Sequence, residues 1–137
     1  GPKYDVPVYN PPPAGATPTE HAVTAATVEA VRLLGAPAIV CLTRSGFTAR
    51  LVSSYRPTVP IIAASDQERT FRRLALVWGV IPVRCFTDEV TYDTLLDCAR
   101  KALIESGIGK RGDRVVVTAG YPFHVRGTTN MLRVEVL

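Results

Sequence analysis

The stretch AIVCLTRSGFT at residues 38–48 decides the fold class of this chain. Its first half, Ala38 to Leu42, is a continuous apolar run of strand length, which is typical of a strand covered on both faces. Its second half is a polar loop that leads into a helical pattern at Thr48. A buried strand that passes through a loop into a helix is the unit of parallel α/β folds. The stretch therefore predicts a central parallel strand followed by a helix.

The same alternation of helix and strand continues on both sides. Upstream, a capping Thr17, Pro18 and a Glu at the third position after the cap predict a helix that closes at Gly35. Downstream, the patterns predict helices at 48–55, 67–77 (capped by Asp66) and 91–106, and strands at 61–64, 81–85, 114–118 and 131–136.

The last predicted strand differs from the others. Its apolar and charged residues alternate, which favours an edge position, and no helical pattern separates it from the strand before it. We therefore expect an α/β fold: a three-layer α/β/α sandwich around a five-stranded mixed sheet whose last strand is antiparallel.

Composition favours one soluble domain and excludes several classes of protein. The 137 residues are 47% hydrophobic and 20% charged, and no apolar run approaches the roughly 20 residues of a membrane helix. The net charge is +4, but the basic residues are scattered among acids, so nucleic acid is not favoured as a partner. We interpret 1–16 as a tag scar, Gly1-Pro2, and a proline-rich arm, and 17–137 as the domain. The alternative is that Gly1-Pro2 belongs to the natural sequence.

The cysteines indicate reduced, buried thiols. Cys41, Cys85 and Cys98 are odd in number, far apart and set in apolar or amphipathic stretches. This pattern is typical of the cytosol. The two histidines, His21 and His124, are distant from every cysteine, so a zinc site has no support.

The loop at 43–48 is a candidate phosphate site. Hydroxyls, one guanidinium, a glycine and the free amides of the following helix suit a dianion. The residues are Thr43, Arg44, Ser45, Gly46, Phe47 and Thr48. No Lys precedes the Ser or Thr as the Walker pattern requires, so nucleotide hydrolysis is not implied. From this loop alone, an ordinary strand-to-helix turn fits equally well.

A second candidate loop, residues 118–130, joins the last two strands. It carries Gly120 and Gly127, and between them Tyr121, His124 and Arg126. Long loops in compact domains are often functional, and this one could fold over the 43–48 loop if the first and fourth strands are neighbours. On its own, a hairpin-like connection with a solvated Arg is favoured.

Taken together, these segments resemble one family. The pieces are residues 41–50, Tyr55-Arg56-Pro57 with 60–63, Trp78-Gly79-Val80, and 127–130 before the last strand. Each segment alone is weak evidence for a family, but the order and spacing of these segments over about 17–137 resemble the C-terminal domain of pyruvate kinases. The resemblance implies a five-stranded mixed sheet with an antiparallel last strand.

The resemblance also implies an allosteric effector site. Thr43, Arg44, Ser45 and Thr48 would contact the effector phosphate, Gly46 would allow backbone approach, and the loop from Gly120 to Gly127 would fold over the ligand. Many members carry Lys or Arg where this chain has Phe47, so one cationic contact is missing. Members activated by fructose bisphosphate use a further Arg, and the corresponding position is Leu95, among acids. A sugar monophosphate or nucleoside monophosphate is therefore favoured over a bisphosphate.

The parent enzyme implied is a cytoplasmic, homotetrameric pyruvate kinase of glycolysis, which transfers phosphate from phosphoenolpyruvate to ADP. Its magnesium and potassium would belong to a barrel of about 250 residues that this chain lacks. The domain itself is expected to have no catalytic residue and no cofactor. Two alternatives remain: a structural oligomerisation module with a vestigial effector site, and a free-standing phosphometabolite-binding protein.

Overall fold

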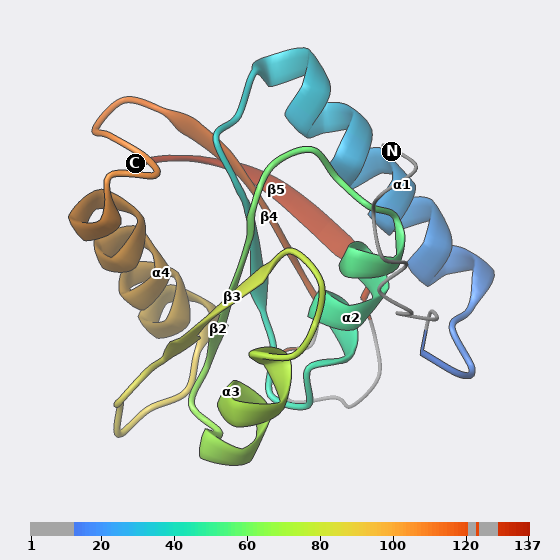
Figure 1. Cartoon of the computed structure of the whole chain (residues 1–137), viewed down its shortest axis with the longest axis horizontal. Coiled ribbons are helices and arrows are strands. Elements are labelled where there is room, and N and C mark those ends of the chain that lie inside the picture. Colours follow the sequence, from blue (N-terminus) through green and yellow to red (C-terminus); the bar gives the residue numbers. More distant parts are fainter. Residues whose placement is uncertain (1–12, 121–122, 124–128) are drawn as a thin grey trace, which may run out of the picture.

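The computed structural model describes residues 13–120, 123 and 129–137. Helices and strands alternate as far as β4, and β5 follows as the last element (Figure 1). The elements are α1 (Pro18–Leu34), β1 (Ile39–Leu42), α2 (Phe47–Ser54), β2 (Ile61–Ser65), α3 (Glu68–Leu74), β3 (Val80–Arg84), α4 (Tyr92–Ser106), β4 (Arg114–Ala119) and β5 (Met131–Val136).

These strands form one sheet in the order β3-β2-β1-β4-β5. β1 pairs in parallel with β2 and β4, and β2 pairs in parallel with β3, whereas β4 and β5 are antiparallel. All of β1 is buried at the centre of the sheet, and β5 lies at an edge. The structure confirms the expected central strand, the antiparallel edge strand and the adjacency of β1 and β4.

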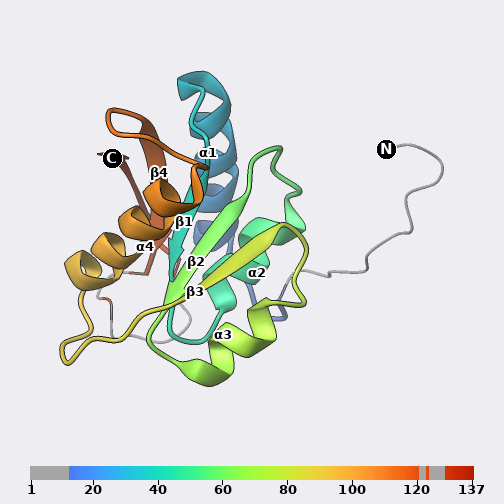
Figure 2. The same ribbon diagram turned by 60° about the vertical axis from the view of Figure 1, so that its left-hand side comes forward.

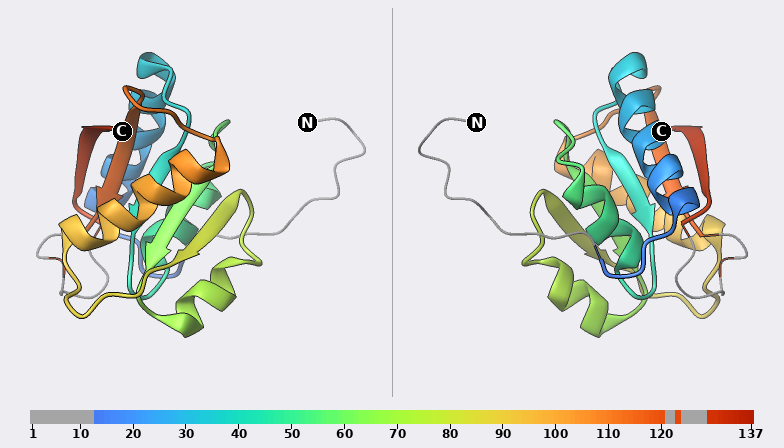
Figure 3. Two further views of the ribbon diagram at one scale, coloured as in Figure 1. Left: turned by 90° about the vertical axis from the view of Figure 1, so that its left-hand side faces the viewer. Right: turned by 90° about the vertical axis from the view of Figure 1, so that its right-hand side faces the viewer.

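Two clusters of buried side chains, one on each face of the sheet, form the core. On one face α4 packs through its buried leucines, Leu95, Leu96 and Leu103. On the other face α1, α2 and α3 contribute Val31, Val52 and Leu74. Full burial of such a side chain contributes about 1.5–3 kcal/mol. Figure 2 and Figure 3 show helices on both sides of the sheet, which confirms the three-layer sandwich.

The predicted start and end of the first helix are confirmed. The Glu20 amide donates to Thr17 Oγ1 at 3.3 Å, and the Thr17 amide donates to Glu20 Oε1 at 2.8 Å, so both halves of the capping box are present. Pro18 begins the helix, and Gly35 ends it in the left-handed conformation with a φ of 62°. None of the described helices is long and apolar enough to cross a membrane.

The predicted cap of the third helix is wrong. Gln67, not Asp66, is the N-cap residue of α3, and its side chain makes no capping hydrogen bond. The Asp66 carboxylate instead accepts hydrogen bonds from Arg44 and from the side chain of Gln67. The helix is also shorter than the expected 67–77, because it ends at Leu74.

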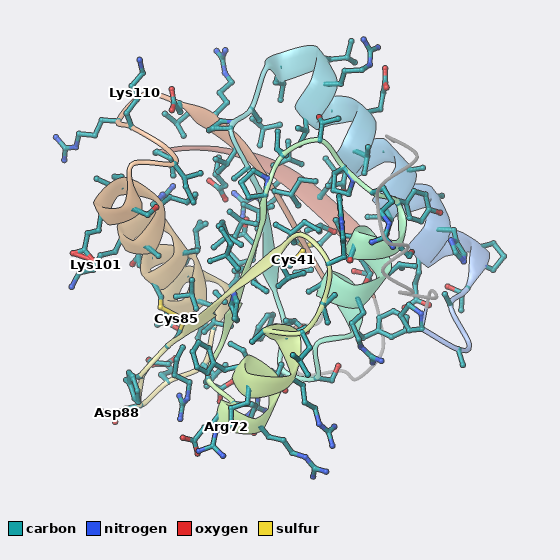
Figure 4. The ribbon with its side chains drawn as sticks, in the orientation of Figure 1. Cys41, Arg72, Cys85, Asp88, Lys101 and Lys110 are labelled. Carbon is teal, nitrogen blue, oxygen red and sulfur yellow. A yellow bond between two sulfur atoms is a disulfide. The ribbon has the colours of Figure 1, made fainter. Side chains whose placement is uncertain are left out.

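The expectation of three reduced cysteines is also wrong. Cys85 and Cys98 form a disulfide that joins the end of β3 to α4, with their Cα atoms 6.0 Å apart. The pairing arises because α4 packs across the sheet beside β3, which the sequence spacing alone does not reveal. Cys41 is free and buried at the centre of the sheet, and burial raises the pKa of its thiol. Figure 4 labels both Cys41 and Cys85.

Candidate functional site

The 43–48 loop lies beyond the carboxyl end of the central strand. The Thr43 amide donates to the Ala64 carbonyl at 3.1 Å, so the hydrogen bonds between β1 and β2 continue for one residue into the loop. The chain then turns at Gly46 and enters α2 at Phe47. In open α/β sheets this edge is where ligands bind, because loops and helix N-termini converge there.

Gly46 fixes the turn of this loop. Its φ of 89° lies in the left-handed region that favours glycine, and a Cβ atom there would lie 3.3 Å from Leu74 Cδ2. Its amide donates to Thr43 Oγ1 at 2.8 Å, and Thr43 is buried. The Thr43 hydroxyl therefore already takes part in a hydrogen bond that shapes the loop.

Ser45 is exposed at the start of α2. Its hydroxyl oxygen accepts a hydrogen bond from the Phe47 amide at 3.3 Å. A hydroxyl that accepts one hydrogen bond still has its own hydrogen to donate, so Ser45 can also donate to an anion. The positive end of the α2 dipole favours an anion at the same place.

Arg44 is turned toward β2 and α3. Its Nε and Nη2 donate to the two carboxylate oxygens of Asp66, at 3.3 and 3.2 Å. Its carbonyl accepts a hydrogen bond from the Thr70 hydroxyl at 2.5 Å. Burial acts to raise the pKa of Asp66, but hydrogen bonds from Arg44 and Gln67 and the charge of Arg44 lower it below its ordinary value. Sequence reasoning missed Asp66 as a partner because it was interpreted as a helix cap.

Thr48 ties the loop to the segment before β5. Its hydroxyl lies 2.7 Å from the Thr129 hydroxyl, and both side chains are buried. The Thr129 amide donates to Glu20 Oε2 at 3.2 Å. Glu20 is only 2% exposed, so it is a buried carboxylate in addition to its part in the capping box. Thr129 belongs to the Gly-Thr-Thr-Asn segment that the family resemblance singled out, but no feature of the sequence indicated its contact with Glu20.

The second candidate loop is described only in part. Gly120 follows β4 directly. Tyr121, His124, Arg126 and Gly127 lie outside the described residues. Phe123 is partly buried and packs against the core cluster that α4 covers.

Leu95 cannot serve a ligand. Its side chain is fully buried between α4 and the sheet. Arg100 lies five residues further along α4, and its guanidinium is near two carboxylates, 3.5 Å from Asp97 and 3.7 Å from Glu135. Neither position therefore offers an open, unneutralised cation.

An open pocket of about 430 Å³ lies beyond the carboxyl ends of β2 and β3. It is lined by Asp66, Arg84, Cys85, Phe86, Thr87 and Asp88. The Arg84 guanidinium stacks on the Phe86 ring, 4.6 Å from its centroid. Asp66 lines the pocket and also binds Arg44, so the pocket adjoins the Arg44 side of the 43–48 loop. This pocket could not be predicted, since no motif in the sequence marks the residues after β3.

Comparison with known proteins supports the resemblance. The family model described as the alpha/beta domain of pyruvate kinase matches residues 21–135. A pyruvate kinase of Agrobacterium vitis is 41% identical over 114 residues, which cover 83% of this chain and 24% of that protein. The pyruvate kinase of Clostridium acetobutylicum is 42% identical over 120 residues, which cover 87% of this chain and 25% of that protein. The pyruvate kinase of Geobacillus stearothermophilus is 46% identical over 108 residues, which cover 76% of this chain and 18% of that protein.

The chain thus spans about a quarter or less of the length of these relatives. The matched region contains β1 to β4, the 43–48 loop and all of β5 except its last residue, Val136. With a family match over most of its length and a five-stranded mixed sheet, this chain belongs to the pyruvate kinase alpha/beta domain family.

Proposed function

We propose that this chain is the effector-binding and subunit-contact domain of a pyruvate kinase. Its family match and its share of the relatives' length, 18% to 25%, support a parent protein with a separate catalytic barrel. That parent would be a cytoplasmic homotetramer that transfers phosphate from phosphoenolpyruvate to ADP. Its magnesium and potassium would be bound in the barrel.

The arrangement of the 43–48 loop is the observation that carries the proposal. The loop presents an exposed Ser45 and Arg44 at the N-terminus of α2, at the carboxyl end of the central strand. Ser45 and Thr48 would donate hydroxyl hydrogens to phosphate oxygens, Arg44 would supply charge, and the backbone near Gly46 would donate amides.

The loop between β4 and β5 would complete the site. Thr129 already contacts Thr48, so the end of this loop meets the 43–48 loop. We propose that Tyr121, His124 and Arg126, between Gly120 and Gly127, cover a bound effector. An effector that binds one arrangement of the tetramer better than another shifts the population toward that arrangement, which is the basis of allosteric control.

A monophosphate is the proposed class of effector. The burial of Leu95 supports this preference, since no cation projects from that position toward a second phosphate. Sugar monophosphates and nucleoside monophosphates both fit this description, and a base could stack on Tyr121 or Phe123.

A titration of the purified chain tests the proposal. Calorimetry with glucose 6-phosphate, ribose 5-phosphate, AMP and fructose 1,6-bisphosphate should show saturable binding of at least one. Backbone NMR should place the largest amide shifts at residues 44–49. If none of the four binds, or if the shifts lie elsewhere, the effector role is wrong.

The structural module with a vestigial site is the second candidate function. One observation favours it: the guanidinium of Arg44, the loop's single basic side chain, already pairs with a carboxylate. The same titration separates the two functions, because a purely structural module binds none of the phosphates.

A further inference from the structure

The ion pair between Arg44 and Asp66 occupies the guanidinium that an anion at the 43–48 loop would need. Both bonds run to one carboxylate, from Nε and from Nη2. The Asp66 side chain is only 12% exposed, whereas that of Arg44 is 45% exposed. The carboxylate is thus the fixed partner, and the guanidinium is the partner that can move.

Neighbouring contacts hold this pair on one side of the loop. The Gln67 side chain donates to Asp66 Oδ2 at 2.7 Å, and the Thr70 hydroxyl donates to the Arg44 carbonyl. Both residues lie at the start of α3, on the β2 side of the central strand. Thr48, by contrast, contacts Thr129 on the β4 side. Arg44 is therefore directed away from the side on which Thr48 joins the loop to β5.

We propose that Asp66 sets the affinity for the effector, because it competes with the effector anion for Arg44. This inference rests on the proposed function of the 43–48 loop. The guanidinium has five N–H donors, and the carboxylate takes two of them and offsets its charge. A ligand must share the guanidinium with Asp66 or displace it. Asp66 thereby lowers the affinity for every anion that uses Arg44.

A double-mutant cycle tests this competition. Calorimetry would compare glucose 6-phosphate binding to the unaltered chain, Asp66→Asn, Arg44→Gln and the double variant. Asp66→Asn should bind about twofold to fivefold more tightly, in line with the strength of an exposed ion pair. In the Arg44→Gln background the same change should have little effect, because the group under competition is gone.

The matched control is Asp88→Asn, which removes the same charge from the same pocket. If Asp88→Asn tightens binding as much as Asp66→Asn does, the gain is a general charge effect and the inference is wrong. Unchanged or weaker binding of Asp66→Asn also overturns it. Thermal unfolding of each variant shows whether it is folded.

A measurement without ligand separates this inference from the proposed function. In the unaltered chain the Arg44 Nε–H NMR signal should be protected and restrained, and Asp66→Asn should release it. Identical signals in both chains overturn the inference, whatever binds. If the chain and its Asp66→Asn variant bind none of the phosphates, the proposed function fails and the competition fails with it. If the unaltered chain binds and Asp66→Asn binds no better, the competition alone fails.

Discussion

At the scale of single residues, Gly46 meets two constraints at once. Its backbone is left-handed, and a Cβ atom would contact Leu74. Gly46→Ala should lower the free energy of unfolding by about 1–3 kcal/mol, measured by urea denaturation. Gly35→Ala is the matched control, since Gly35 is also left-handed but a Cβ atom there meets nothing within 4 Å. Equal losses in the two variants would show that the contact with Leu74 costs nothing.

The hydroxyls of the 43–48 loop should dominate phosphate binding. Each charge-assisted hydrogen bond contributes roughly 1.5–3 kcal/mol, so Ser45→Ala combined with Thr48→Ala should weaken glucose 6-phosphate binding at least about tenfold. The control is Ser54→Ala at the other end of α2, where the hydroxyl bonds to the Leu51 carbonyl. Calorimetry measures both variants, and unchanged affinity in the double variant would contradict the proposed site.

Asp66 should make stability depend on acid pH. Its pKa in the folded chain is below the ordinary value, because hydrogen bonds from Arg44 and Gln67 outweigh the effect of burial. The ionised carboxylate therefore stabilises the fold above a pH of about 4, and this contribution is lost as the pH falls through the lower folded pKa. Asp66→Asn should be less stable than the unaltered chain at pH 7, and the gap should close in strong acid. A gap of equal size at both pH values in urea unfolding would refute this account.

At the scale of elements, the disulfide joins β3 to α4 and should stabilise the fold. Cys85 and Cys98 are 13 residues apart, and the chain-entropy model assigns a closed loop of that length about 3 kcal/mol. Cys98→Ser should lower the free energy of unfolding by about this amount in urea. Dithiothreitol should destabilise the unaltered chain similarly and leave the variant unchanged. If dithiothreitol lowers the stability of both chains equally, breaking the disulfide is not the cause of the destabilisation.

The helices and strands could be predicted from the sequence because local patterns encode them. A buried run such as 38–42 and the capping box at Thr17 act within a few residues, and both predictions hold with ends shifted by a residue or so. The prediction failed at Asp66, where a side chain suited to capping bonds instead to a residue 22 positions away. The disulfide was missed for the same reason, since tertiary packing brings its cysteines together.

The candidate site was predictable in position but not in its contacts. The location of the 43–48 loop follows from the order of strand, loop and helix, which the structure confirms. The direction of Arg44 depends on Asp66, between β2 and α3, and the burial of Glu20 involves residue 129. Such long-range pairings leave no periodic trace in the sequence.

At the scale of the whole molecule, one end of the sheet gathers several of these features. The 43–48 loop, the Arg44–Asp66 pair, the 430 Å³ pocket and Cys85 all follow the carboxyl ends of β1, β2 or β3. In Figure 4, Arg72 on α3 and Asp88 after β3 mark this end. Lys110, which precedes β4, lies at the other end of the molecule in the same view. A ligand at the carboxyl end therefore meets the ends of four parallel strands, β1 to β4, and the starts of α2, α3 and α4.

This arrangement predicts which phosphates the domain prefers. The first phosphate would have the hydroxyls and amides of the 43–48 loop, whereas a second would approach α4, where Leu95 is buried and Asp93 lies in the first turn. A phosphate close to carboxylates gains nothing that water does not already provide. Fructose 1,6-bisphosphate should therefore bind no more tightly than glucose 6-phosphate, ribose 5-phosphate or AMP in calorimetry. Clearly tighter binding of the bisphosphate would reveal a second cationic subsite, and Arg100→Gln and Arg126→Gln would then identify the residue that supplies it.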